Sequence, residues 1–149
     1  SKYMELVDRP TDEASVNDAL LKFAQITEEK VCNSKWVPGV QDYLKQHHQS
    51  QKHIIASATP MDEIRRIARR WKLWCDVDQI SGSPLSKFEA AVDAMKRRKI
   101  SRRHAILLGD TALDLDTAHR LGIKFCLRRT SYNSHIRLPH GFIEVHNFI

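Results

Sequence analysis

Residues 105–114 read AILLGDTALD: a short apolar run, a Gly-Asp pair, and a second aspartate four positions later. An apolar run of this length that ends at a glycine is typical of a strand buried on both faces, as in a parallel sheet. Residues 111–121 then show the spacing of an amphipathic helix, with Leu115, Ala118 and Leu121 on one face and Gly122 at its end. The stretch therefore predicts a strand, a turn that carries carboxylates, and a helix.

The same alternation of strand and helix signals extends along the chain in both directions. Further strands are expected at residues 53–57, 74–80, 123–127 and 142–145. Further helices are expected over residues 12–31 and 39–49, after Thr59-Pro60, and after Ser83-Pro84 with Phe88, Ala91, Val92 and Met95 inward. Strands separated by helices of this length predict βαβ units and an α/β, Rossmann-like, mostly parallel sheet with flanking helices. In such folds ligands bind at the carboxyl ends of the strands.

The composition is that of a soluble globular protein. The chain has 149 residues, 42% apolar and 28% charged, which is enough for one domain with its own core. No apolar run approaches the roughly 20 residues of a membrane helix, so no membrane partner is expected. Three scattered cysteines indicate a reducing, cytoplasmic setting. The net charge of +6 favours anionic partners without choosing between a phosphorylated metabolite and nucleic acid.

Three segments, in this order, resemble motifs of the haloacid dehalogenase-like (HAD) hydrolase superfamily. IIASATP (54–60) is similar to the second motif, GSPLSK (82–87) to the third, and LLGDTALD (107–114) to the fourth. Their order and spacing resemble the phosphatase-like branch that has a helical cap after the first motif, and VPGV (37–40) is similar to the return from that cap to the core. The resemblance implies a partial helical cap at residues 1–36 and a HAD-like α/β core at residues 37–149.

The resemblance also implies an activity: Mg²⁺-dependent hydrolysis of a phosphate monoester, a small phosphorylated metabolite, through an aspartyl-phosphate. Hydroxyl and backbone N–H groups at a helix start can bind a phosphoryl group, a lysine can add positive charge, and carboxylates can hold Mg²⁺. The residues implied are Ser57, Ala58, Thr59 and Lys87 for phosphate, Asp110 and Asp114 for the metal, and Lys87 and Asp110 for catalysis. Each motif alone also fits a helix cap, a solvated lysine or a turn, and it is their common position at one end of the sheet that favours a phosphate site.

The first motif of the family, an apolar strand ending in Asp-x-Asp, has no good copy upstream of the expected return from the cap. Its first aspartate is the nucleophile and its second the general acid and base. Asp8, in YMELVDRPT (3–11), is a candidate nucleophile with Pro10 in place of the second acid, but the segment is more typical of a turn that opens a helix. Asp76-Val77-Asp78 matches the letters but falls between the second and third motifs, so we interpret it as unrelated. The chain as given therefore lacks an identified nucleophile.

The missing strand leaves alternatives open. In the family it lies between the strands that here end at Ser57 and Asp110, so its absence would leave two unpaired inner edges. The chain could belong to a longer protein, residues 1–8 could replace the strand, or a partner chain could fill the place, for example by swapping in a homo-oligomer. A pseudoenzyme with a binding or regulatory role is a further alternative. Basic clusters such as residues 65–72 allow nucleic-acid binding in principle. The sequence contains no nucleic-acid-binding motif, so we do not expect a nucleic-acid partner.

Overall fold

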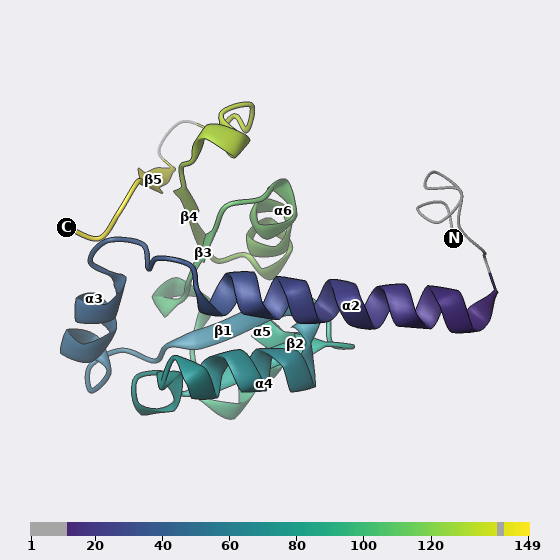
Figure 1. Ribbon diagram of the computed structural model, residues 1–149. Coiled ribbons are helices and arrows are strands. Elements are labelled where there is room, and N and C mark those ends of the chain that lie inside the picture. Colours follow the sequence, from purple (N-terminus) through teal and green to yellow (C-terminus); the bar gives the residue numbers. More distant parts are fainter. Residues whose placement is uncertain (1–11, 140–141) are drawn as a thin grey trace. The chain divides into compact units, whose positions relative to one another are not determined.

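The computed structural model describes residues 12–139 and 142–149 (Figure 1). Within these residues helices and strands alternate, as the sequence predicts. The helices are α2 (Glu13–Cys32), α3 (Val40–His47), α4 (Met61–Arg70), α5 (Lys87–Arg97) and α6 (Ala112–Leu121), with short 3-10 helices at Leu73–Cys75, Arg102–His104 and Ser131–Asn133. The strands are β1 (Ile54–Pro60), β2 (Gln79–Ser83), β3 (Ile106–Gly109), β4 (Lys124–Arg128) and β5 (Ile143–Val145).

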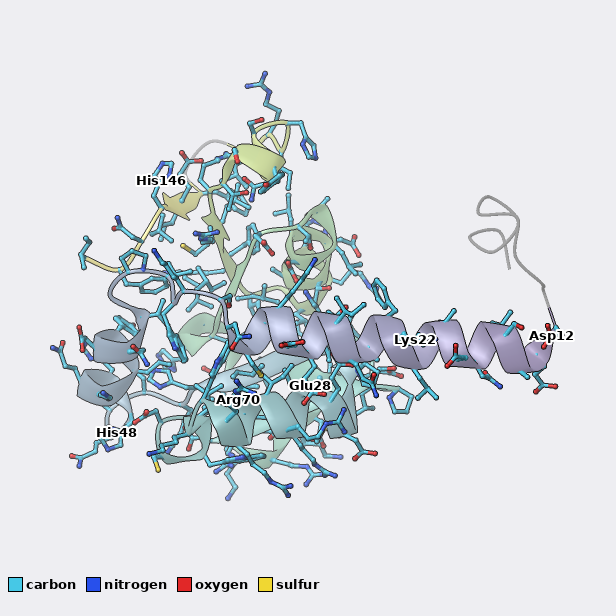
Figure 2. All side chains as sticks on the ribbon, in the orientation of Figure 1. Asp12, Lys22, Glu28, His48, Arg70 and His146 are labelled. Atoms are coloured by element: carbon cyan, nitrogen blue, oxygen red, sulfur yellow. The ribbon has the colours of Figure 1, made fainter. Side chains whose placement is uncertain are left out.

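The chain divides into two compact units, the first ending at Lys35 and the second beginning at Trp36. Of the first unit the structure describes α2, which begins directly after Asp12 (Figure 2). The Asp12 carboxylate caps the helix by accepting a hydrogen bond from the backbone N of Ser15 at 3.0 Å. None of the residues of α2 is buried. The interpretation of this unit as a partial helical cap stays a prediction.

The second unit contains the strands, and every pairing is parallel. β1 pairs with β2, with Ile55 opposite Ile80. β3, β4 and β5 form a separate sheet in that order, with Leu107 opposite Phe125. The α/β, Rossmann-like architecture is thus confirmed, and its strands are divided between two sheets.

Each sheet has its own apolar core. Beside β2 lie Ala68, Leu73, Val77 and Ile80. Trp36 and Trp71 pack against them, with ring centres 4.9 Å apart and ring planes tilted by 45°. Beside β4 lie Ala118, Phe125, Leu127 and Ile136. The helices connect the two halves: α5 packs on β1 and β2, α6 packs on β3 and β4, and α5 and α6 pack on each other. The Arg120 guanidinium of α6 also lies 4.4 Å from the centre of the Phe88 ring of α5.

Two sequence predictions were wrong in their boundaries. The strand expected at 74–80 begins only at Gln79, because Leu73–Cys75 forms a 3-10 helix after the left-handed Lys72. The helix expected to open at Ser83-Pro84 opens at Ser86, whose side chain forms a reciprocal capping box with Glu89.

The register of the α5 face also differs from the prediction by one position. Ala90 and Ala94 are buried, whereas Val92, expected inward, is 42% exposed. The helix presents small residues to its neighbours, and the larger apolar side chains that dominate the sequence pattern lie at the margin. None of the described helices is long and apolar enough to cross a membrane.

Truncation of Leu127, which is fully buried in β4, should lower the stability of the second unit. We expect Leu127→Ala to reduce the free energy of unfolding by about 3 kcal/mol, because the substitution removes buried apolar area and leaves a cavity. Leu113→Ala is the matched control, since Leu113 is 60% exposed and its truncation should cost less than about 1 kcal/mol. Urea denaturation followed by circular dichroism measures both, and equal losses would contradict the assignment of Leu127 to the core.

Candidate active site

The residues that the sequence singles out lie at the carboxyl ends of β1 and β3 and at the starts of the helices. Ser57, expected at the end of its strand, is the fourth of the seven residues of β1, which continues to Pro60. Lys87 is the first residue of α5, Asp110 follows β3, and Asp114 lies in the first turn of α6. The Lys87 Nζ lies 2.6 Å from the Asp114 Oδ1. Residues that are 27 positions apart are thus brought into direct contact.

Asp114 is the most heavily hydrogen-bonded carboxylate of this group. Its side chain is only 3% exposed. One oxygen accepts from Lys87, and the other accepts from the Thr111 hydroxyl at 2.6 Å, the Thr111 N at 3.1 Å and the Asp110 N at 3.3 Å. Burial by itself would raise the pKa of Asp114, but the hydrogen bonds from Lys87 and Thr111 outweigh it and lower the pKa below its usual value. Asp114 is therefore ionised at neutral pH and paired with the lysine.

Gly109 makes room for this arrangement. A Cβ at position 109 would collide with the side chain of Asp114. Thr111 also caps α6, with its hydroxyl accepting from the Asp114 N while the Asp114 carboxylate reaches back to the Thr111 N. The sequence Gly-Asp-Thr-x-x-Asp thus specifies a turn, a helix cap and the position of a buried charge together.

Asp110 differs from Asp114 in that its carboxylate is exposed and forms no hydrogen bond or ion pair within the described residues. Its backbone is fixed on both sides: its N donates to Asp114, and its O accepts from the Asn133 Nδ2 at 2.9 Å. The carboxylate is therefore presented by a rigid turn with its oxygens available.

Asn133 is a positioning residue that sequence reasoning missed. It is 4% exposed and donates to the backbone oxygens of both Asp110 and Arg128, which ties the ends of β3 and β4 together. Its Oδ1 also accepts from the Thr130 N at 2.8 Å, as the last member of a capping box. The Thr-x-x-Asn spacing of residues 130–133 was the available signal.

Residues 57–59 leave the regular strand ladder. The register between β1 and β2 shifts between Ala56 and Pro60, and the Ser57 Oγ accepts a hydrogen bond from the Thr59 N at 3.1 Å. This hydrogen bond gives Ser57 a structural role in the local turn that does not depend on a bound phosphate. The Ser57 hydroxyl remains free to donate, but no hydrogen bond joins Ser57, Ala58 or Thr59 to Lys87, Asp110 or Asp114 in the described residues.

The other acidic candidates lie elsewhere. Asp78 belongs to the opposite end of β1, where its carboxylate accepts from the His53 N and pairs with Lys52 at 3.1 Å. Asp8 lies outside the described residues. The described residues contain no group of three or more His, Cys, Asp or Glu side chains that could hold a metal ion.

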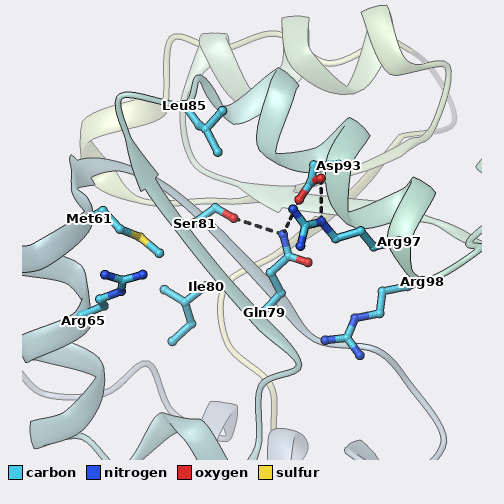
Figure 3. A pocket seen from close by; sticks show the side chains of 9 residues that line it. All are labelled: Met61, Arg65, Gln79, Ile80, Ser81, Leu85, Asp93, Arg97 and Arg98. Carbon is cyan, nitrogen blue, oxygen red and sulfur yellow. Dashed lines mark hydrogen bonds and ion pairs between the residues drawn. The ribbon is translucent and has the colours of Figure 1, made fainter.

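An open hollow of about 530 Å³ lies beside β2, between α4 and α5, and contains none of the predicted site residues (Figure 3). Its arginines already have partners: Arg97 donates to Asp93 at 2.7 Å, Arg98 to the Asp78 O, and Arg65 lies 3.7 Å from Asp62. The hollow therefore offers little unpaired charge to an anion.

Solved structures with a similar architecture include proteins described as hydrolases. A haloacid dehalogenase-like family hydrolase from Streptococcus pneumoniae matches with a TM-score of 0.64 at 20% identity, over 78% of this chain and 57% of its own. CbbY from Rhodobacter sphaeroides matches with a TM-score of 0.76 at 12% identity, over 94% and 66%. A subfamily IA HAD hydrolase from Geobacter sulfurreducens matches with a TM-score of 0.73 at 15% identity, over 99% and 83%.

This chain thus spans less than two thirds of the length of the first two of these proteins. No protein-family model and no curated protein matches its sequence.

Replacement of Asp114 should test the buried ion pair. At pH 7 we expect Asp114→Asn to lower the free energy of unfolding by about 2–3 kcal/mol, because Lys87 loses its partner and an amide replaces an acceptor of four hydrogen bonds. The pKa of Asp114 is lowered on folding, so the stabilisation is complete above the unfolded pKa of about 4 and is lost as the pH falls through the folded pKa. The difference between wild type and variant should therefore shrink below about pH 4.

Asp116→Asn is the matched control, because Asp116 is exposed and lies 3.8 Å from Arg120 on the surface of the same helix. We expect it to change stability by less than about 0.5 kcal/mol. Denaturant unfolding between pH 3 and 7 measures both variants, and a pH-independent loss in Asp114→Asn would contradict the role of its charge.

Proposed function

Since the chain has the HAD-like fold of these hydrolases, we propose that it forms the core of a phosphatase-type hydrolase that cleaves a small phosphate monoester with the help of Mg²⁺. The observation that carries the proposal is the contact between Lys87 and Asp114 at the carboxyl end of the strands, beside the unpaired carboxylate of Asp110. Transfer of a phosphoryl group depends mainly on positioning and on compensation of negative charge. Lys87 supplies a positive charge that Asp114 holds in position at the carboxyl end of the strands.

Lys87 would bind the phosphoryl group. Its side chain is 24% exposed, and Asp114 holds its ammonium group at 2.6 Å. An ammonium has three donors, of which Asp114 takes one, so donors remain for phosphoryl oxygens. The Ser57 hydroxyl and the backbone N–H of Ala58 would donate to the same group from β1. The Thr59 N–H could join them only by giving up its hydrogen bond to the Ser57 Oγ.

The two aspartates would have different tasks. Mg²⁺ commonly binds one or two carboxylates together with water and a substrate phosphate, and Asp110 offers one free carboxylate on a fixed turn. Asp114 already accepts four hydrogen bonds, so we assign it to hold Lys87 and the turn in place rather than to direct metal coordination. When bound, the ion would supply compensation for the charge of the phosphoryl group and the nucleophile.

The nucleophile is not among the described residues. Hydrolysis through an aspartyl-phosphate would require an aspartate at the end of a strand near Lys87 and Asp110. Because the sequence offers no clear copy of the first motif, we expect the 149-residue chain by itself to bind phosphate without turning over a phosphate ester. A natural role as a phosphate-binding pseudoenzyme would share this site and lack the nucleophile altogether.

Binding of inorganic phosphate to this chain tests the site without requiring turnover. We expect phosphate to bind with a millimolar dissociation constant in the presence of Mg²⁺, and at least tenfold more weakly with EDTA. Asp110→Asn should abolish the dependence on Mg²⁺, because it removes the free carboxylate. The measurement is a titration followed by ³¹P nuclear magnetic resonance, with Asp116→Asn as the matched control that keeps the wild-type dependence.

The same preparations should be incubated with p-nitrophenyl phosphate. Absence of turnover together with Mg²⁺-dependent binding is the expected result. Turnover that Asp110→Asn abolishes would show that a nucleophile is present in the chain, with Asp8→Asn as the next variant. Phosphate binding that is the same in wild type and in Asp110→Asn would contradict the proposed site.

A further inference from the structure

The connection between α5 and β3 carries the densest run of basic residues in the sequence. Residues 96–104, which we call the basic turn, read KRRKISRRH and contain a single serine, Ser101. Four cations come before Ile100 and the serine, and two arginines and a histidine follow them. Every residue of the basic turn except Ile100 is exposed. The structure thus presents one hydroxyl group at the surface with positive charge on both sides of it in the chain.

The cations of the basic turn have donors to offer to a partner. Within the described residues, no hydrogen bond or ion pair engages the side chains of Lys99, Arg102 and Arg103. The Arg98 side chain is 38% exposed and donates to the backbone O of Asp78. A guanidinium has five N–H donors, so Arg98 keeps donors for a further acceptor. The basic turn is therefore a surface that suits carboxylates.

Ser101 itself is accessible in both its backbone and its side chain. Its backbone is extended, with φ −79° and ψ 151°. Its Oγ lies 3.0 Å from the Nδ1 of His104, on the exposed side of the turn. Two residues earlier Lys99 has the left-handed conformation, with φ 54°, which turns the chain away from α5. An enzyme that modifies a side chain of a folded protein needs such an exposed connection.

A second serine has a similar sequence environment, but the fold hides it. Residues 127–132 read LRRTSY, which places two arginines three and two positions before Ser131. The Arg129 side chain is 18% exposed, binds Glu144 at 2.6 Å and donates to two backbone oxygens. The Nε of Arg128 is buried. The arginines before Ser131 are thus held within the fold, whereas the cations of the basic turn face the solvent.

We propose that Ser101 is a phosphorylation site for a serine kinase whose substrate groove is lined by carboxylates. Kinases select substrates partly by charge pattern, and an acidic groove attracts a serine that has cations on both sides. In the reaction the Ser101 Oγ forms a bond to the γ-phosphorus of a nucleoside triphosphate. The bond from that phosphorus to the β,γ-bridging oxygen breaks, the serine proton goes to a base of the kinase, and the nucleoside diphosphate leaves.

The phosphate of the product would lie among cations. A phosphoserine carries about −1.5 to −2 charges at neutral pH and three acceptor oxygens. His104 already lies within hydrogen-bonding distance of Ser101, and Arg102 and Arg103 follow it directly in the chain. The basic turn would therefore compensate the added charge. Ser101 precedes β3 whereas Asp110 follows β3, so the modification lies at the opposite end of the strand and the inference does not depend on the proposed function.

Kinase assays on the folded chain and on two peptides test the site. The probes are the catalytic subunit of cyclic-AMP-dependent protein kinase and the catalytic domain of protein kinase C, each with ATP and Mg²⁺. We expect mass spectrometry to find phosphate on Ser101 of the folded chain, and Ser131 to stay unmodified. Synthetic peptides of residues 95–105 and 125–135 should both be phosphorylated on these serines, because a peptide exposes the arginines that the fold holds.

A double variant tests the recognition by charge. Arg98→Gln with Lys99→Gly removes the cations three and two positions before the serine, and glycine fits the left-handed backbone at position 99. We expect kcat/KM for the phosphorylation of Ser101 to fall about tenfold, because the acidic groove loses two attractive charges. Lys22→Gln with Lys35→Gln is the matched control, since it removes two exposed charges elsewhere and should leave kcat/KM unchanged.

Three results would overturn the proposal. One is the absence of phosphate on Ser101 of the folded chain with both kinases. Another is equal modification of Ser101 and Ser131 in the folded chain, which would contradict the selection by the fold. The third is an unchanged kcat/KM in the Arg98→Gln, Lys99→Gly variant. Circular dichroism verifies that each variant is folded, and Ser101→Ala, which should take up no phosphate at this position, identifies the modified residue.

Discussion

The ion pair between Lys87 and Asp114 is the interaction on which the described site depends. A carboxylate that is 3% exposed must be paired and hydrogen-bonded, because an isolated charge in that position would cost several kcal/mol. The lysine comes from the helix that covers β1 and β2, and the aspartate from the helix that covers β3 and β4. The requirement to neutralise one buried charge therefore fixes the two helix starts relative to each other and holds the ammonium group at the end of the strands.

This constraint also separates the roles of two aspartates that look equivalent in the sequence. Both carboxylate oxygens of Asp114 accept hydrogen bonds, which come from Lys87, Thr111 and the Asp110 backbone N. Asp110 keeps its carboxylate free because only its backbone is bound, by Asp114 on one side and Asn133 on the other. A rigid backbone with an unengaged carboxylate is suited to a hard cation, whereas a saturated carboxylate is suited to positioning.

The sequence predicted what local patterns determine and missed what tertiary contacts determine. The apolar runs at 53–57, 105–108 and 123–127 became strands, and Gly122 ends α6 in the left-handed conformation as expected. The order of the motifs predicted the fold, while the pairing of Lys87 with Asp114 needed the packing of α5 on α6.

The predictions that were wrong concern features that tertiary contacts determine. Trp74 and Cys75 lie in a 3-10 helix because the chain turns at Lys72, and α5 buries Ala90 and Ala94 in place of larger residues that the pattern favoured. Asn133 donates to the backbone oxygen of Asp110, just after β3, and to that of Arg128 in β4. The Thr-x-x-Asn pattern could have indicated its cap but not these two contacts. The strands are divided between two sheets, and the expectation of a missing central strand stays a prediction.

The division of the sheet has a consequence for the site. Ser57 belongs to the sheet of β1 and β2, whereas Asp110 belongs to the sheet of β3 to β5, and the contacts of α5 with α6 are what hold the two sheets together. A phosphate held by both residues would need a fixed distance between the two sheets. By linkage, a phosphate bound by both residues should in turn stabilise the packing of α5 on α6, because binding and packing favour the same distance between the two sheets.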